Sequence, residues 1–131
     1  MLDRILIVGH GSIGKRHLRI VRECHPDSDI RVLRHRVCDE LLDYSNGCFH
    51  KLEDACIFSP QASVIANPAP FHIDLASALI EAGSHVLVEK PLAESANLAV
   101  ESLIASSNNK RVLQVGYNLR FLDSLIRFKE I

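Results

Sequence analysis

The sequence lacks an excess of charge of either sign. Its 131 residues carry 15 Lys and Arg against 16 Asp and Glu, for a formal net charge of −1. This balance argues against a nucleic acid or an anionic membrane surface as the partner. The hydrophobic share of 47% is that of an ordinary globular protein, and the length suits a single domain with a sizeable core.

Paired cysteines and long apolar runs are also missing. The four cysteines, Cys24, Cys38, Cys48 and Cys56, include no Cys-x-x-Cys pair, and no His/Cys spacing matches a zinc site. We therefore expect reduced thiols and no bound metal. Only four consecutive apolar residues precede Gly9, too few for the core of a signal peptide, and no later stretch is long enough to span a bilayer. Together these features predict a cytoplasmic protein.

Glycine is scarce, but three of the six glycines fall in one hexapeptide, Gly9-His10-Gly11-Ser12-Ile13-Gly14. The apolar run Ile5–Val8 precedes it, and a helical pattern over Ser12–Cys24 follows it. A strand, a glycine turn and a helix in this order are the fingerprint of a dinucleotide-binding site. The flanking segments disfavour the alternative, an ordinary turn with incidental glycines.

Each glycine of the hexapeptide has a predicted task. Gly9 permits a tight turn, Gly11 has no Cβ to block a pyrophosphate, and Gly14 lets helix and strand pack closely. The free N–H groups of Ser12, Ile13 and the rest of the first helical turn then face the diphosphate.

Strands alternate with helices along the rest of the chain. The predicted strands are Ile5–Val8, Ile30–Leu33, Cys48–His50, Ala62–Ala66, His85–Val88 and Val112–Val115. The predicted helices are Ser12–Cys24, a weak Asp39–Tyr44, Leu52–Ile57, Phe71–Ala82, Ala93–Ser106 and Leu122–Ile131. This alternation predicts an α/β domain with a doubly wound parallel sheet. Ligands of such sheets bind beyond the carboxyl ends of the strands, where residues 9–14, 34–36, 67–72, 89–91 and 116–121 should gather.

The second strand ends in a basic segment, Arg34-His35-Arg36. An NAD site would place a carboxylate there to accept hydrogen bonds from the ribose 2′-hydroxyl. Two guanidinium groups instead favour a 2′-phosphate, because they pair with it through charge-assisted hydrogen bonds. We therefore expect NADP rather than NAD. The alternative is an exposed basic strand end that only stacks on the adenine.

Several motifs in a fixed order resemble the Gfo/Idh/MocA oxidoreductases. They are Gly9–Gly14 with Arg16-His17, Asn67-Pro68 with His72, Glu89-Lys90-Pro91-Leu92, and Val115-Gly116-Tyr117-Asn118 with Arg120-Phe121. The segment from Glu81 to Ala93 is especially similar to the family's pattern. The resemblance covers nearly the whole chain and implies a Rossmann fold.

The resemblance implies hydride transfer between a nicotinamide cofactor and a sugar, nucleotide-sugar or polyol. In the family, residues matching Asn67, Pro68 and His72 flank the cofactor. The Glu89-Lys90-Pro91 motif lies by the nicotinamide and substrate, and Arg120 matches a position near the nicotinamide. Lys90 would be the functional lysine, whose ammonium can polarise the oxygen undergoing oxidation and stabilise alkoxide character.

Family enzymes continue into a substrate domain that supplies the catalytic Asp/His pair and the usual oligomer interface. We expect residues 1–121 to form the dinucleotide-binding domain and residues 122–131 to start a truncated second one, because Leu122, Leu125, Ile126 and Phe128 form an apolar stripe. The chain alone would then be inactive. Formation of a homo-oligomer is possible. The alternatives are a stand-alone dinucleotide-binding module without catalysis, and a retained fold that has lost binding.

Overall fold

The computed structural model describes residues 2–36 and 42–130. Its strands form one six-stranded parallel sheet in the order β3-β2-β1-β4-β5-β6. The strands are β1 (Arg4–Val8), β2 (Asp29–Leu33), β3 (Gly47–Phe49), β4 (Ala62–Ile65), β5 (His85–Val88) and β6 (Leu113–Val115). The helices are α1 (Ser12–Cys24), α2 (Leu52–Ile57), α3 (His72–Glu81), α4 (Ala96–Asn108) and α5 (Asp123–Lys129), with short 3₁₀ turns η1 (Ala69–Phe71) and η2 (Asn118–Phe121).

The central strand β1 divides the interior into two cores. Ile5 and Ile7 contribute to a core with Leu18 of α1, whereas Leu6 and Val8 belong to a core with residues of α2 and α3. Successive side chains of a strand point to opposite faces, so an unbroken apolar run is what a strand covered on both faces requires. The predicted doubly wound fold is therefore confirmed.

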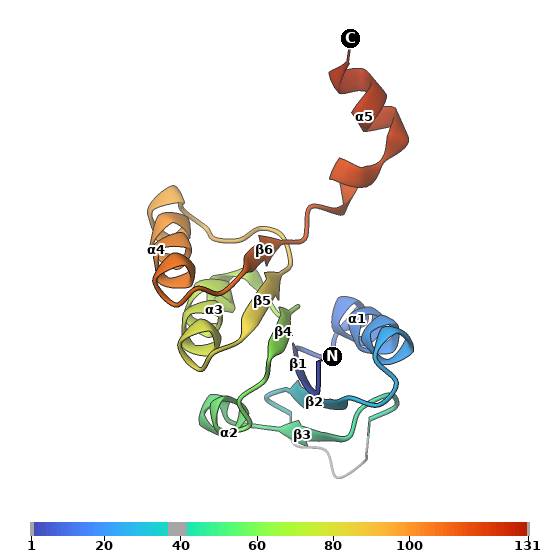
Figure 1. The fold of residues 1–131 in the computed structure, drawn as a ribbon, viewed down its shortest axis with the longest axis vertical. Coiled ribbons are helices and arrows are strands. Elements are labelled where there is room, and N and C mark those ends of the chain that lie inside the picture. The colour runs from blue at the N-terminus through green and yellow to red at the C-terminus, as the bar shows by residue number, and fades with distance from the viewer. Residues whose placement is uncertain (1, 37–41, 131) are drawn as a thin grey trace.

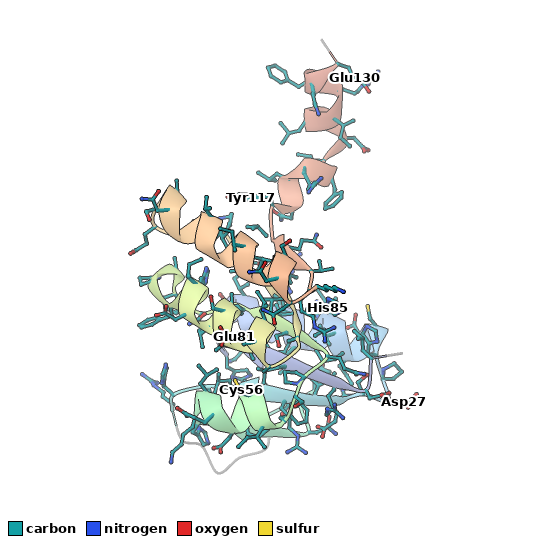
Figure 2. The ribbon with its side chains drawn as sticks, turned by 60° about the vertical axis from the view of Figure 1, so that its left-hand side comes forward. Asp27, Cys56, Glu81, His85, Tyr117 and Glu130 are labelled. Carbon is teal, nitrogen blue, oxygen red and sulfur yellow. The ribbon has the colours of Figure 1, made fainter. Side chains whose placement is uncertain are left out.

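Helices cover the two faces of the sheet unequally (Figure 1). α2, α3 and α4 form a layer on one face, which Figure 2 shows side by side, with Cys56 on α2 and Glu81 on α3. α1 covers the other face beside β1. As a result, the α1 face of β5 and β6 is left open, and a hollow described below lies there.

Strand β2 carries two charged residues, Asp29 and Arg31, and the structure uses Arg31 for packing. Its guanidinium binds Asp29 through two hydrogen bonds of 2.6 and 3.0 Å. It also lies over the rings of Phe49 and Phe58, 6.0 and 5.7 Å from the ring centres. The salt bridge raises the pKa of Arg31. The charge is thus balanced where the apolar pattern is interrupted.

The weak helix predicted over 39–44 is wrong where the structure describes it. Residues 39–41 lie outside the described residues, and Leu42–Tyr44 form a turn with Tyr44 at φ 68°. Arg22 reaches from α1 and donates to the Tyr44 carbonyl at 3.1 Å and to Asn46 Oδ1 at 2.6 Å. These tertiary hydrogen bonds give the acceptors of this segment a partner in place of helical hydrogen bonds.

Two other helices begin at different residues than predicted. The helix expected over 71–82 starts as the 3₁₀ turn η1 and continues as α3. A proline near the start of η1 suits a first turn, where its missing N–H is not needed. The helix expected over 93–106 is shifted three residues along the chain at its start, to Ala96. The remaining predicted strands and helices match the structure to within one or two residues.

The last segment stands away from the sheet. Figure 1 shows η2 and α5 extending from the end of β6, and Figure 2 shows Tyr117 where this extension starts and Glu130 near its far end. The apolar side chains of Leu122, Leu125, Ile126 and Phe128 are all exposed, Phe128 by 76%. Within the described residues, no helix is long and apolar enough to cross a membrane.

Candidate functional site

The glycine loop lies between β1 and α1 at the carboxyl edge of the sheet. Gly9 has a φ of 95°, and a Cβ there would lie 2.9 Å from the Ala66 carbonyl oxygen. A Cβ on Gly14 would clash with the carbonyl oxygen of Gly9. Both glycines are therefore required by the fold itself.

Gly11 differs from the other two glycines. A Cβ built on it meets nothing within 4 Å, so the space above it is open. Gly11 is also the N-cap of α1, which has no side-chain cap and no acidic residue in its first turn. The first N–H groups of the helix are thus left without a side-chain acceptor, which is the arrangement that binds anions. Ser12 and Ile13 are exposed beside it.

A hollow of about 470 Å³ lies on one side of this loop. The sequence-predicted residues that line it are Gly9, Gly11, Arg34, His35, Arg36, Asn67 and Pro68. Backbone hydrogen bonds hold its walls together. The N–H of Gly9 donates to Leu33 O at 2.9 Å, and the N–H of Arg34 donates to Phe49 O at 3.0 Å. Among the described residues that line the hollow there is no Asp or Glu.

A second hollow, of about 500 Å³, lies on the other side of the loop, against the open face of β5 and β6. Ile13, Asn67, Glu89 and Lys90 line it, together with Gln114–Asn118 and Phe121. Arg120 is not among its lining residues. Its guanidinium lies instead over the ring of Phe121, 5.5 Å from the ring centre.

Asn67 belongs to both hollows, and its side chain carries an unsatisfied atom. It follows β4, the strand next to β1, so it lies where the chain order of the sheet reverses. Its Oδ1 is buried and has no hydrogen-bond partner. Buried polar atoms are nearly always paired, so an acceptor without a donor at the junction of two hollows suits a ligand that donates to it.

His72 is buried, with 1% exposure, and does not line either of these hollows. Its Nε2 lies 2.7 Å from Asn67 O, and its Nδ1 lies 2.8 Å from Pro91 O. The ring therefore joins the loop after β4 to the loop after β5. The structure gives this residue a bracing contact between two predicted site segments.

Glu89 and Lys90 take different positions in the loop after β5. Glu89 is half-buried and accepts a hydrogen bond of 2.7 Å from Nε2 of His17 on α1. Lys90 is exposed at the edge of the second hollow. Sequence reasoning gave His17 only a place in a motif, because nothing local indicates a partner 72 residues away.

His10 and His50 were missed as well. His10 lines the first hollow, and His50 lines it too and donates from Nδ1 to Arg34 O at 3.0 Å. Burial, and then the charges of Lys15 and Arg34, lower the pKa of His10. The only signal in the sequence was the position of His10 inside the glycine hexapeptide.

Residues 4–117 match the Gfo/Idh/MocA family, described as an oxidoreductase family with an NAD-binding Rossmann fold. The chain belongs to this family. The resemblance stated from the motifs is therefore confirmed, and the glycine loop and the two hollows lie in the Gfo/Idh/MocA NAD-binding domain.

Individual proteins agree with this assignment. An inositol 2-dehydrogenase/D-chiro-inositol 3-dehydrogenase of Shouchella clausii (strain KSM-K16) is 27% identical over 139 residues, which cover 99% of this chain and 40% of that protein. YrbE of Bacillus subtilis (strain 168), an uncharacterized oxidoreductase, is 31% identical over 137 residues, which cover 95% and 38%.

Solved structures show the same fold. The WlbA dehydrogenase from Bordetella pertussis, in complex with NADH and UDP-GlcNAcA, superimposes with a TM-score of 0.86 at 22% identity. The match covers 99% of this chain and 42% of WlbA. The chain thus spans about two fifths of the length of the Gfo/Idh/MocA proteins that it matches.

Proposed function

We propose that this chain holds a nicotinamide dinucleotide across the carboxyl edge of its sheet and serves hydride transfer to or from a sugar, nucleotide-sugar or polyol. One observation carries the proposal. Two hollows of about 470 and 500 Å³ flank the glycine loop and meet at Asn67, whose buried Oδ1 has no partner. A dinucleotide has two nucleoside halves joined by a diphosphate, which is the shape that such a pair of hollows accepts.

In this proposal the glycine loop binds the diphosphate. Gly11 leaves room for it, and the N–H groups at the start of α1, at Ser12, Ile13 and Gly14, donate to it. Asn67 and Pro68 line the path between the halves, and the Oδ1 of Asn67 accepts a hydrogen bond from a ribose hydroxyl. His72 and Pro91 act through the brace that keeps Asn67 in place.

The cofactor is NADP in this proposal. Arg34, His35 and Arg36 line the first hollow, and no carboxylate among the described residues lines it to accept a ribose 2′-hydroxyl. Guanidinium groups bind a phosphate through charge-assisted hydrogen bonds. The expected cost of Arg34→Asp is at least about tenfold in NADPH affinity, with NADH affinity changed less than about twofold.

The nicotinamide half belongs beside Glu89 and Lys90 in the second hollow. A nicotinamide held there would supply or accept the hydride. Lys90 is the proposed catalytic residue, because its ammonium at the edge of the hollow can donate a hydrogen bond to the reacting oxygen and stabilise negative charge on it. Arg120 is proposed to contact the nicotinamide end from η2.

Residues 1–121 are proposed to form the cofactor domain, and residues 122–131 to begin a substrate domain. The exposed apolar side chains of α5 support this division. The names of the related dehydrogenases, which include an inositol enzyme and WlbA with UDP-GlcNAcA, support the substrate class. We also place the protein in the cytoplasm, a proposal supported by the free thiols of Cys24 and Cys56.

Calorimetry of the chain with NADPH and with NADH tests the proposal. We expect both to bind, NADPH more tightly, and Gly11→Val to abolish binding of both without loss of the folded state. Absence of binding to either cofactor would refute the function and leave only the fold. Equal effects of Arg34→Asp on the two cofactors would refute the NADP preference. Mixing the chain and cofactor with inositols or sugars separates an enzyme from a binding module, and we expect no turnover.

A further inference from the structure

His10 lies on the boundary between two hollows. It lines the first hollow together with Arg34, and it lines another of about 570 Å³ together with Lys15. Among the described residues it is the only one that both walls share. His10 is half-buried.

The groups around His10 are mostly cationic. On the side of the first hollow the cations are Arg34 and Arg36, and His35 and His50 also line it. On the other side α1 contributes Lys15, Arg16 and Arg19, opposite Asp43 and Tyr44. Asp43 is the one carboxylate among the described residues that line the two hollows. An anion that enters at His10 therefore meets positive charge from both sides.

The backbone holds His10 close to Arg34, although 24 positions separate them in the sequence. The preceding residue, Gly9, donates to the carbonyl of Leu33, and Arg34 is held between β2 and β3 by its own N–H and carbonyl. His50 makes the contact to that carbonyl from the end of β3. The arrangement is thus built before any ligand arrives, which reduces the entropy cost of binding.

The surroundings of His10 disfavour protonation of its ring. Burial disfavours the imidazolium, and the positive charges of Lys15 and Arg34 add to that effect, so that the pKa of His10 lies below its ordinary value. A phosphate monoester carries about −1.5 to −2 charges at neutral pH, and a negative charge of this size beside the ring favours its protonated form.

We propose that His10, Lys15 and Arg34 bind the 2′-phosphate of the dinucleotide, and that His10 takes up a proton as that phosphate binds. The proton comes from the solvent buffer and goes to a ring nitrogen, no covalent bond to the ligand forms, and the imidazolium then donates a charge-assisted hydrogen bond to the phosphate. The inference rests on the proposed function, and it adds His10 as a residue that distinguishes NADP from NAD.

Two adenine nucleotide fragments test the inference without the nicotinamide half. Adenosine 2′,5′-diphosphate carries the 2′-phosphate, and ADP does not. Calorimetry in two buffers of different ionisation enthalpy measures the protons taken up at about pH 7.5, a value above the ordinary pKa of histidine. We expect a substantial fraction of one proton with the 2′,5′-diphosphate and almost none with ADP.

The variant His10→Gln keeps a neutral, hydrogen-bonding side chain. We expect this variant to lose the proton uptake. We also expect the ratio of wild-type to variant affinity for the 2′,5′-diphosphate to be up to about tenfold larger at pH 6 than at pH 8, because one pKa unit corresponds to a factor of ten. The comparison cancels the titration of the phosphate itself. His25→Gln, at the far end of α1, is the matched control and should behave as the wild type.

The outcomes distinguish failure of the inference about His10 from failure of the proposed dinucleotide binding. Equal affinity for both fragments without proton uptake would overturn the inference while cofactor binding stands. Proton uptake that persists in His10→Gln would overturn the role of His10. Inorganic phosphate binding as tightly as the 2′,5′-diphosphate, with the same uptake, would assign a free-phosphate site instead. Failure of NADH, NADPH and both fragments to bind would overturn the proposed function as well. The wild-type uptake measurement does not depend on the folding of any variant.

Discussion

The ring of His17 donates from Nε2 to Oε1 of Glu89 over 2.7 Å, and this bond ties α1 to the loop that carries Lys90. The two side chains are 21% and 24% exposed. On its other side the Glu89 carboxyl group faces Gly116, where a Cβ would lie 3.4 Å away. Glu89 is therefore held between α1 and the segment after β6. This fixes the position of the backbone that carries the adjacent Lys90.

This contact should be measurable as a coupling between the two residues. A double-mutant cycle with His17→Ala and Glu89→Ala, followed by urea unfolding, should give a coupling free energy of about 1 kcal/mol, because a partly buried hydrogen bond to a charged group exceeds a surface ion pair. The control is the cycle for Arg19 and Glu23, a pair on α1 that is 57% and 65% exposed. Equal coupling in the two cycles would contradict the bracing role.

The glycines of the loop should separate stability from binding. Gly14→Ala places a Cβ against the carbonyl of Gly9, so we expect the free energy of unfolding to fall by about 1–3 kcal/mol. Gly11→Ala places its methyl group in open space, so stability should change by less than about 0.5 kcal/mol while dinucleotide affinity falls. Urea unfolding and calorimetry measure the two quantities. A stable Gly14→Ala protein would show that α1 packs less closely on β1 than described.

Replacement of His72 should lower the stability of the fold considerably. His72→Leu removes the partner of two backbone carbonyls, Asn67 O and Pro91 O, and supplies no donor in its place. We expect a loss of about 2–4 kcal/mol in the free energy of unfolding, and a smaller loss for His72→Gln, whose amide N–H still donates. Equal losses for the two variants would mean that volume, rather than hydrogen bonding, determines the effect.

The thiols of Cys56 and Cys24 should differ in reactivity. Burial raises the pKa of the Cys56 thiol, and the carboxylates of Glu53 and Glu81 raise it further. At a pH below that pKa the reactive thiolate is scarcer, so alkylation of Cys56 by iodoacetamide at about pH 8 should be roughly tenfold slower than that of the exposed Cys24. Peptide mass spectrometry over time gives both rates. Raising the pH should narrow the difference, and a constant ratio would point to access rather than ionisation.

Much of the fold could be predicted from the sequence, because the patterns that indicate strands, helices and turns involve neighbouring residues. The strand at His85–Val88 and the helices at Ser12–Cys24 and Leu52–Ile57 have the predicted bounds. Apolar runs mark strands that are covered on both faces, and the glycines mark the turn between β1 and α1. The predicted helix near Tyr44 was wrong because Arg22, on another element, supplies hydrogen bonds that hold a turn.

The candidate site was only partly readable for the same reason. Gly9, Gly11, Arg34, Asn67 and Lys90 could be named because each follows a strand at the carboxyl edge, where ligands of such sheets bind. The sequence did not reveal that Arg120 lies over Phe121 or that His72 is a brace. Both depend on side-chain directions that spacing along the chain does not specify.

The sequence by itself determined the strand and helix order, the glycine loop and the family, because those depend on neighbouring residues and on ordered motifs. Only the tertiary structure decided that Asn67 joins two hollows, that His17 reaches Glu89, and that His10 faces Lys15 and Arg34. The physical reason is the strand order β3-β2-β1-β4-β5-β6, which brings the ends of distant segments to one edge of the sheet, where their charges and hydrogen bonds first act on one another.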